Sequence, residues 1–139
     1  MGWLAWSFLS ALFAAATAIL AKLGVTGIDS NLATAVRTSV VLVFAWAIVL
    51  TTGGAPKLGL ISNRGWLFLV LSGFATGLSW LCYFRALQLG PASKVAPVDK
   101  LSMVLVLAGA AVFLGESISI RTGLGAAMIL GGVYVLASG

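Results

Sequence analysis

The sequence predicts an all-α membrane protein with five transmembrane helices. Of its 139 residues, 61% are hydrophobic and only 8% are charged, whereas soluble domains usually carry about 25% charged residues. A helix of roughly 20 apolar residues crosses a hydrocarbon core about 30 Å thick. Five stretches carry no charge and run on without polar alternation, which favours helices over a barrel: Trp3–Ala21, Thr38–Pro56, Gly65–Phe84, Leu101–Gly115 and Thr122–Gly139.

The first two helices are expected on either side of a short polar turn. Residues 3–21 are rich in alanine, and small side chains let helices approach closely in lipid. No positively charged segment precedes them, so we expect a retained helix and not a signal peptide. The turn Lys22–Ser30 contains glycine as a helix breaker. Asp29 then supplies capping chemistry for a second helix over residues 31–52.

The third helix follows the longest loop, Gly53–Gly65, and begins at Trp66, an aromatic residue typical of a membrane–water interface. The pair Gly90-Pro91 ends it. We expect all five helices to form one multi-pass domain over residues 1–139 in the inner or plasma membrane. The later spans are expected at 66–89, 94–115 and 118–138.

The chain has few groups that catalyse reactions or bind metals. It has no histidine, Cys82 is its one cysteine, and its three acids are Asp29, Asp99 and Glu116. Neither a thiolate cluster nor an oxygen cage for a metal is expected. Its eight lysines and arginines are spread singly and form no basic stripe for nucleic acid. We therefore expect no enzyme activity, no metal and no cofactor.

Arg37 is the clearest charged residue inside a span, about two turns or 10 Å from the start of the second helix. A charge within a span costs about 2.5–3.5 kcal/mol on insertion scales and usually faces a cavity or a partner. Arg37 is therefore a candidate to bind an anionic group of a solute, or to pair with Asp99. The alternative is that its long side chain snorkels to the interface.

Asp99 and Lys100 are the second and third candidates. Neighbours on a helix point about 100° apart, so we expect these two not to pair with each other. Both are assigned to substrate binding, and Asp99 is also the best-placed carboxylate for proton coupling. The alternative for Asp99 is a place near the start of the fourth helix, where the helix dipole stabilises an acid.

Aromatic and small residues supply further candidates. Trp80 and Tyr83 lie three apart on one face of the third helix, where they line a substrate pocket or belong to an interfacial belt. Small residues four apart allow close helix contacts within the chain or with a second copy. These packing candidates are Gly73 and Gly77 in the third helix and Gly123, Ala127 and Gly131 in the fifth.

The basic residues give almost no signal for orientation. An excess of lysine and arginine marks the cytoplasmic side, but the loops of the two faces carry three such residues each: Lys22, Arg85 and Lys94 against Lys57, Arg64 and Arg121. This balance predicts insertion in both orientations and an antiparallel homodimer. Counting Arg37 and Lys100 with the first face gives five against three, and the alternative is then one fixed orientation.

The C-terminal sixty residues carry a family resemblance. They contain "YFRALQLG" at Tyr83–Gly90, the turn Ala92-Ser93, Pro97, Leu114-Gly115-Glu116 and a glycine-rich last helix. These features resemble the EamA-type domain of the drug/metabolite transporter superfamily, and the resemblance extends over the whole chain.

The resemblance implies a transporter of small organic solutes, often outward, by alternating access. Most members carry two such domains as ten helices in inverted orientation, so this chain would be half of that assembly, completed by a second copy or a hetero-partner. In the family, helices 1, 3 and 4 surround a central cavity, which gives weight to Trp80, Tyr83 and Asp99. Lys100 departs from the apolar residue common at its position.

The leading hypothesis is thus a secondary transporter, an exporter of amino acids, metabolites or amphipathic compounds. One alternative is a non-transporting scaffold or regulatory subunit, which would need no cavity and no functional charges. A second is a lipid-head-group flippase, which also fits a basic cavity.

Overall fold

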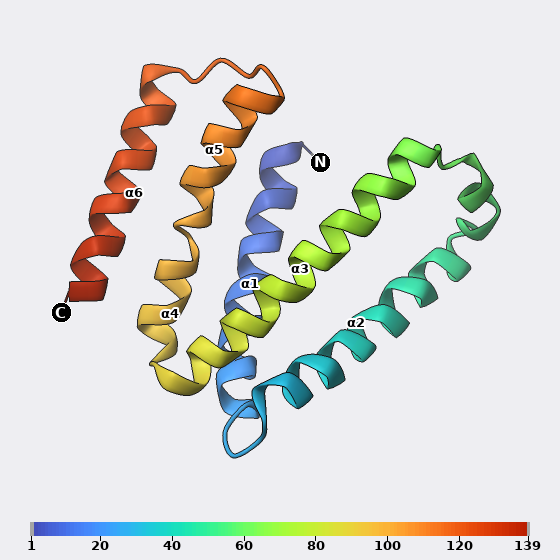
Figure 1. Ribbon diagram of the computed structural model, residues 1–139, viewed down its shortest axis with the longest axis horizontal. Helices are drawn as coiled ribbons and strands as arrows, with labels where there is room; N and C mark the ends of the chain where they lie inside the picture. Colours follow the sequence, from blue (N-terminus) through green and yellow to red (C-terminus); the bar gives the residue numbers. More distant parts are fainter. Residues whose placement is uncertain (1, 139) are drawn as a thin grey trace. The chain divides into compact units, whose positions relative to one another are not determined.

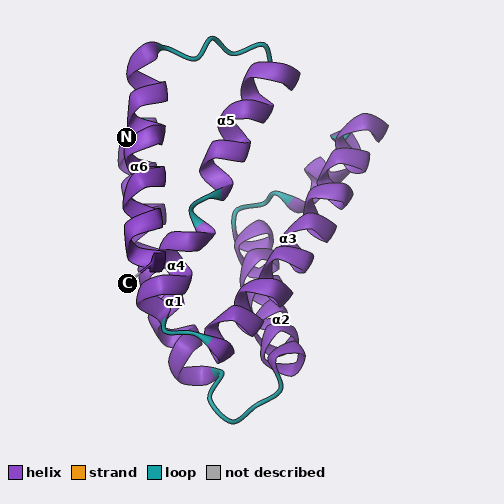
Figure 2. Cartoon of the chain, turned by 60° about the vertical axis from the view of Figure 1, so that its left-hand side comes forward, coloured by secondary structure: helices purple, strands orange, loops and turns teal. Residues whose placement is uncertain are grey.

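The protein is helical throughout the part of the chain that the structure describes. A computed structural model describes residues 2–138, and these contain no strand (Figures 1 and 2). Five helical segments within them are long and apolar enough to cross a membrane, which confirms the predicted fold class. The elements are α1 (Trp3–Gly24), α2 (Ser30–Thr51), the 3₁₀ helix η1 (Ala55–Leu60), α3 (Asn63–Leu89), α4 (Ala92–Asp99), α5 (Ser102–Phe113) and α6 (Ile120–Ser138).

The chain divides into two compact units, Met1–Leu89 and Gly90–Gly139. In the first unit, α1, α2 and α3 run alternately up and down, and α3 packs against both of the other helices. The turn between α1 and α2 contains Gly27, whose φ of 77° lies in the left-handed region that favours glycine. Asp29 then caps α2, because its Oδ1 accepts hydrogen bonds from the backbone N–H groups of Asn31 (2.9 Å) and Leu32 (3.0 Å).

The best-packed part of the first unit lies where α1 and α3 end. Val25, Phe84 and Leu87 are almost fully buried there. The Lys22 ammonium donates a hydrogen bond to the carbonyl oxygen of Leu87, one of the last carbonyls of α3, which have no partner within the helix. The Gln88 amide also donates to the carbonyl oxygen of Ile28, in the turn before α2. These bonds fix the end of α3 against α1 and against the α1–α2 turn.

In the second unit, the span expected at residues 94–115 consists of two helices, α4 and α5. Pro97 lies inside α4 and has no N–H to continue the helical ladder. The bonds that follow are shorter-range: Lys100 N–H donates to Pro97 (3.0 Å) and Leu101 N–H to Val98 (3.0 Å). Such i to i+3 bonds belong to a tighter 3₁₀-like turn, which separates the two helices.

The second unit also shows how α5 ends and how α6 is held. Gly115 has a φ of 67°, and both Leu114 and Glu116 donate their N–H groups to the carbonyl oxygen of Ala110 (3.1 Å each). A left-handed glycine with returning bonds is a common helix stop. Downstream, α6 packs against α4, and Val133 of α6 is buried.

Most large apolar side chains of the described residues point outward, including Trp3, Phe74 and Phe113. In water such a surface would be unstable, since monomeric soluble proteins rarely expose large contiguous apolar patches. A helix surrounded by lipid gains from the same side chains, because the hydrocarbon solvates them. The exposure pattern therefore agrees with a chain embedded in a membrane.

The cap at Asp29 generates the first prediction. Replacing an N-cap acid by alanine removes the acceptor for two backbone N–H groups and destabilises a helix by about 1 kcal/mol. We expect Asp29→Ala to lower the midpoint of SDS-induced unfolding, followed by circular dichroism in mixed micelles. Asp29→Asn keeps an acceptor oxygen and serves as the control with a smaller loss. Equal midpoints for the alanine variant and the parent protein would contradict the capping role.

Candidate functional site

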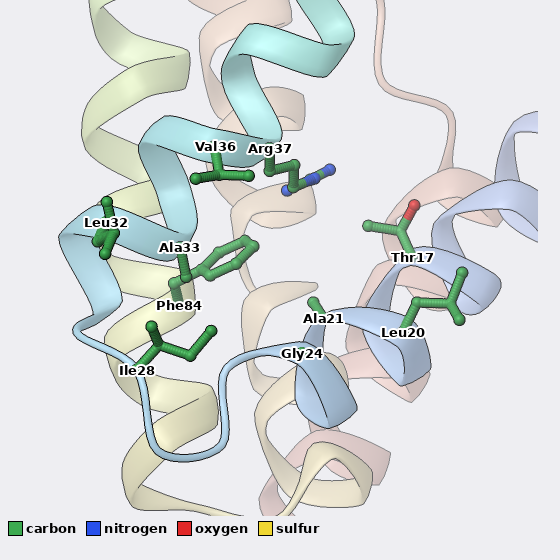
Figure 3. A pocket seen from close by; sticks show the side chains of 10 residues that line it. All are labelled: Thr17, Leu20, Ala21, Gly24, Ile28, Leu32, Ala33, Val36, Arg37 and Phe84. Carbon is green, nitrogen blue, oxygen red and sulfur yellow. The ribbon is translucent and has the colours of Figure 1, made fainter.

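A cavity of about 420 Å³ opens in the first unit beside the C-terminal half of α1 and the N-terminal half of α2 (Figure 3). Its wall combines residues of α1, of the α1–α2 turn and of α2 with Phe84 of α3. The lining residues are Thr17, Leu20, Ala21, Gly24, Ile28, Leu32, Ala33, Val36, Arg37 and Phe84. The volume falls in the range of small-molecule sites, about 300–1,000 Å³. Its wall is apolar except for the side chains of Thr17 and Arg37.

Arg37 is held at this wall by aromatic rings and not by a carboxylate. Its guanidinium carbon Cζ lies 4.3 Å from the centroid of the Trp80 ring and 5.5 Å from that of Phe84. A cation over an aromatic face within about 6 Å is attracted by the ring quadrupole. Within residues 2–89 the structure describes no ion pair for Arg37. Figure 3 shows the side chain reaching from α2 into the space facing Thr17 and Leu20 of α1.

Thr17 differs from the other threonines of the described first unit. The hydroxyl groups of Thr26, Thr34, Thr38, Thr51, Thr52 and Thr76 each donate to the carbonyl oxygen four residues earlier. That bond is the usual way for a hydroxyl on a helix to be satisfied locally. No such bond is described for Thr17, which lines the cavity on the side facing Arg37. The cavity therefore offers a cation and a hydroxyl from two helices.

The structure brings Arg37 and Trp80 together, two residues that the sequence analysis treated as separate candidates. Tyr83 is half-buried on α3 but does not line the cavity, and neither does Trp80. Sequence reasoning missed Phe84 and Thr17 as site residues. For Phe84 a signal existed, because it follows Trp80 by four positions and residues four apart share a helix face. Thr17 carried no signal, since it differs from the other threonines only in its hydrogen bonding.

The positions of Asp99 and Lys100 differ from two expectations of the sequence analysis. We predicted that they would not pair, but Lys100 Nζ lies 3.7 Å from Asp99 Oδ2. The expected 100° separation applies inside a regular helix, whereas Asp99 is the last residue of α4 and Lys100 follows it in the turn. For the same reason Asp99 does not lie at the start of its helix, so the dipole of α4 gives it no support; α5 begins only at Ser102. Both side chains are exposed.

The four glycines among the small-residue candidates make no close helix contact within their own units. A Cβ added at Gly73 or Gly77 of α3 would meet no described atom of the first unit within 4 Å. The same holds for Gly123 and Gly131 of α6 within the second unit. Ala127 lies between the last two at the same spacing and is exposed. These faces are open to a partner.

Comparison with known proteins assigns the chain to a family. A family model described as the EamA-like transporter family matches residues 1–138. The chain belongs to the EamA-like transporter family. This finding confirms the resemblance inferred from the sequence. A relative from Sinorhizobium sp., named "Uncharacterized transporter in cobO 3'region", is 53% identical over 135 residues, which cover 97% of this chain and 96% of that protein. No solved structure matches the chain.

The contact between Arg37 and Trp80 can be measured in this EamA-family protein by a double-mutant cycle. We expect Arg37→Met and Trp80→Leu to couple by about 0.5–2 kcal/mol in the free energy of unfolding, because each removes one half of a cation–π pair. SDS-induced unfolding of the single and double variants provides the four values.

Arg64 and Phe68 supply the matched control. Arg64 Cζ lies 5.7 Å from the centroid of the Phe68 ring, and Arg64 is exposed outside the cavity. We expect a smaller coupling for Arg64→Met with Phe68→Leu. A coupling at Arg37 and Trp80 no larger than at this control pair would show that the rings do not hold Arg37.

Proposed function

We propose that this EamA-family chain is a secondary transporter that exports small organic solutes by alternating access. The proposed solutes are amino acids, related metabolites or amphipathic compounds. The observation that carries the proposal is Arg37, a cation two turns inside a membrane-spanning helix, at the wall of a cavity and without an ion-pair partner in its unit. Membrane-embedded charges usually mark substrate or ion pathways. A scaffold subunit would need no charged residue at a cavity wall.

The proposed division of roles follows the two units. In the first, Arg37 recognises an anionic group, while Trp80 and Tyr83 contribute the aromatic surroundings of that cation. In the second, Asp99 and Lys100 supply charge at the break between α4 and α5. Broken helices of this kind hold substrates and coupling ions in many transporters. Asp99 is the proposed proton-coupling residue because it lies within the span Ala92–Phe113, whereas Asp29 caps α2 and Glu116 follows the end of α5.

We further propose that two copies of the chain combine in antiparallel orientation. The first unit supports the charge assignment behind this proposal. Lys22 and Arg85 lie near the ends of α1 and α3 that the Lys22–Leu87 bond joins. Lys57 of η1 and Arg64 of the first turn of α3 lie at the other end. Basic residues thus mark both ends of the unit, which leaves little bias for orientation. The open glycine faces of α3 and α6 are available for the contact.

A transport assay tests the central proposal. The purified protein is reconstituted in liposomes and screened for flux of labelled solutes, with and without a pH gradient. For an anionic solute, we expect Arg37→Gln to reduce uptake about 10- to 100-fold, because charge-assisted hydrogen bonds contribute about 1.5–3 kcal/mol. A double variant, Arg64→Gln with Arg85→Gln, removes one basic residue from each face and so keeps their loop charges equal; both residues lie outside the cavity, and flux should stay within about twofold. If no solute class is transported, the scaffold alternative replaces the proposal.

The same liposomes test proton coupling. We expect Asp99→Asn to abolish the stimulation of flux by a pH gradient, because the amide cannot bind and release a proton. Exchange of solute without a gradient should persist in this variant. Glu116→Gln, which changes a carboxylate beyond the end of α5, serves as the control and should keep the stimulation. Gradient-driven flux in Asp99→Asn equal to that of the parent protein would remove Asp99 from the coupling step.

Reporter fusions at the C-terminus test the antiparallel assembly. A reporter active only in the cytoplasm and one active only outside it should both give signal, because the balanced charges allow both insertions. Adding two lysines to the loop that contains Lys57 should shift the signals strongly toward one orientation. Signal from a single side in the parent protein would refute dual insertion.

A further inference from the structure

We infer that the cavity beside Arg37 is specific for an amphipathic monocarboxylate, an apolar body with one carboxylate and no ammonium group. The inference rests on the proposed function and narrows its solute class. Three features of the cavity carry it: the geometry of the guanidinium, the position of Thr17 and the lack of an acid in the wall.

The aromatic contacts leave the donors of Arg37 free. Neither Trp nor Phe carries a conventional hydrogen-bond acceptor, so these rings attract the cation without accepting from its N–H groups. The N–H groups of arginine form a planar fork that matches a carboxylate with two parallel bonds. Trp80 and Phe84 interact with this cation as rings, and neither replaces a hydrogen-bond acceptor. An incoming carboxylate can therefore bind Arg37 without first displacing an ion-pair partner within the unit.

Thr17 adds a second polar group at the same cavity. Its hydroxyl is not described as bonded to the carbonyl of Phe13, and Figure 3 places it on α1, across the space from Arg37. A hydroxyl that donates to a carboxylate forms a short, strong bond. The remaining lining residues are apolar, so the rest of the ligand must be apolar to gain from the contact.

The wall contains no carboxylate for an α-ammonium group. None of the lining residues is acidic, and the one acid in the first 89 residues, Asp29, accepts the two capping bonds of α2. An ammonium brought against this wall would lose part of its hydration without gaining a carboxylate from the first unit, which is unfavourable. One cation also matches one negative charge. A zwitterionic amino acid should therefore bind worse than the carboxylate with the same body.

A matched set of ligands tests this. Labelled 3-phenylpropionate is the probe, measured by equilibrium dialysis against the purified protein in lipid nanodiscs. L-Phenylalanine has the same body with an added ammonium, and 3-phenylpropanamide lacks the charge. We expect both to compete at least tenfold more weakly than unlabelled 3-phenylpropionate.

Variants locate the binding at the cavity. We expect Arg37→Gln to weaken binding at least tenfold and Arg37→Lys to weaken it several-fold, since lysine keeps the charge but loses the fork. Thr17→Val keeps the shape and loses the hydroxyl, and should weaken binding about three- to tenfold, whereas Thr17→Ser should bind as the parent does. Arg64→Gln is the control for loss of charge and should change nothing. Size-exclusion profiles show whether each variant is folded.

Three results would overturn the inference. Equal competition by L-phenylalanine would show that an ammonium is accepted, and flux of amino acids would then leave the transporter proposal standing. Binding that Arg37→Gln does not weaken would place the ligand elsewhere. The third result is that 3-phenylpropionate does not bind, while the parent protein retains an anionic phospholipid that Arg37→Gln loses. The cavity would then be assigned to a lipid head group. Conversely, binding with the expected selectivity in a protein that moves no solute would support the inference and refute transport.

Discussion

The constraint on which the structure depends is that a polar group in lipid finds its partner inside the protein. Water is absent from the hydrocarbon, so each span is a helix that satisfies its own backbone. Many side-chain hydroxyls follow the same rule, as Thr34 shows by bonding to the carbonyl of Ser30. Helix ends follow it too, because Lys22 binds a terminal carbonyl of α3 and Asp29 binds the first N–H groups of α2. A departure from this rule at a cavity wall is therefore informative, and Thr17 and Arg37 combine the two.

The way Arg37 is satisfied also suits a reversible binding site. A buried ion pair would stabilise the charge strongly, and a ligand would have to break it before binding. A cation–π contact with a ring such as Trp80 or Phe84 stabilises the cation less, typically by about 0.5–2 kcal/mol. These rings accept no conventional hydrogen bond from the N–H groups of Arg37. The residue is thus fixed in place while its hydrogen-bonding capacity remains for a ligand. Such an arrangement is preorganised, which lowers the cost of binding.

Composition and apolar run length were sufficient to predict five spans, and an aspartate in the turn before the second helix was sufficient to predict its cap. Both features depend on local sequence. The break after α4 was harder. Pro97 was visible, but the bond that a proline cannot make is the one to the carbonyl four residues earlier, at Ser93. The interruption lies after Pro97, in the 3₁₀-like turn at Lys100 and Leu101, which a proline alone does not predict. The wrong expectation for Asp99 and Lys100 followed directly, since it assumed a continuous helix. The contact of Arg37 with Trp80 depends on how α2 packs against α3, and no periodicity within one helix predicts that register.

The cavity of the first unit is formed by few elements. Its lining comes from α1, α2 and a single residue of α3, and the unit's tightly buried residues lie near one end, around Val25 and Leu87. A transporter must close the site alternately from each face of the membrane, which needs two bodies that move against each other. In two-domain relatives within this superfamily, the second body is part of the same chain. For this chain the proposed second body is a second copy, and the faces at Gly73, Gly77 and Gly131, where an added Cβ would meet nothing within 4 Å, are candidates for its contacts.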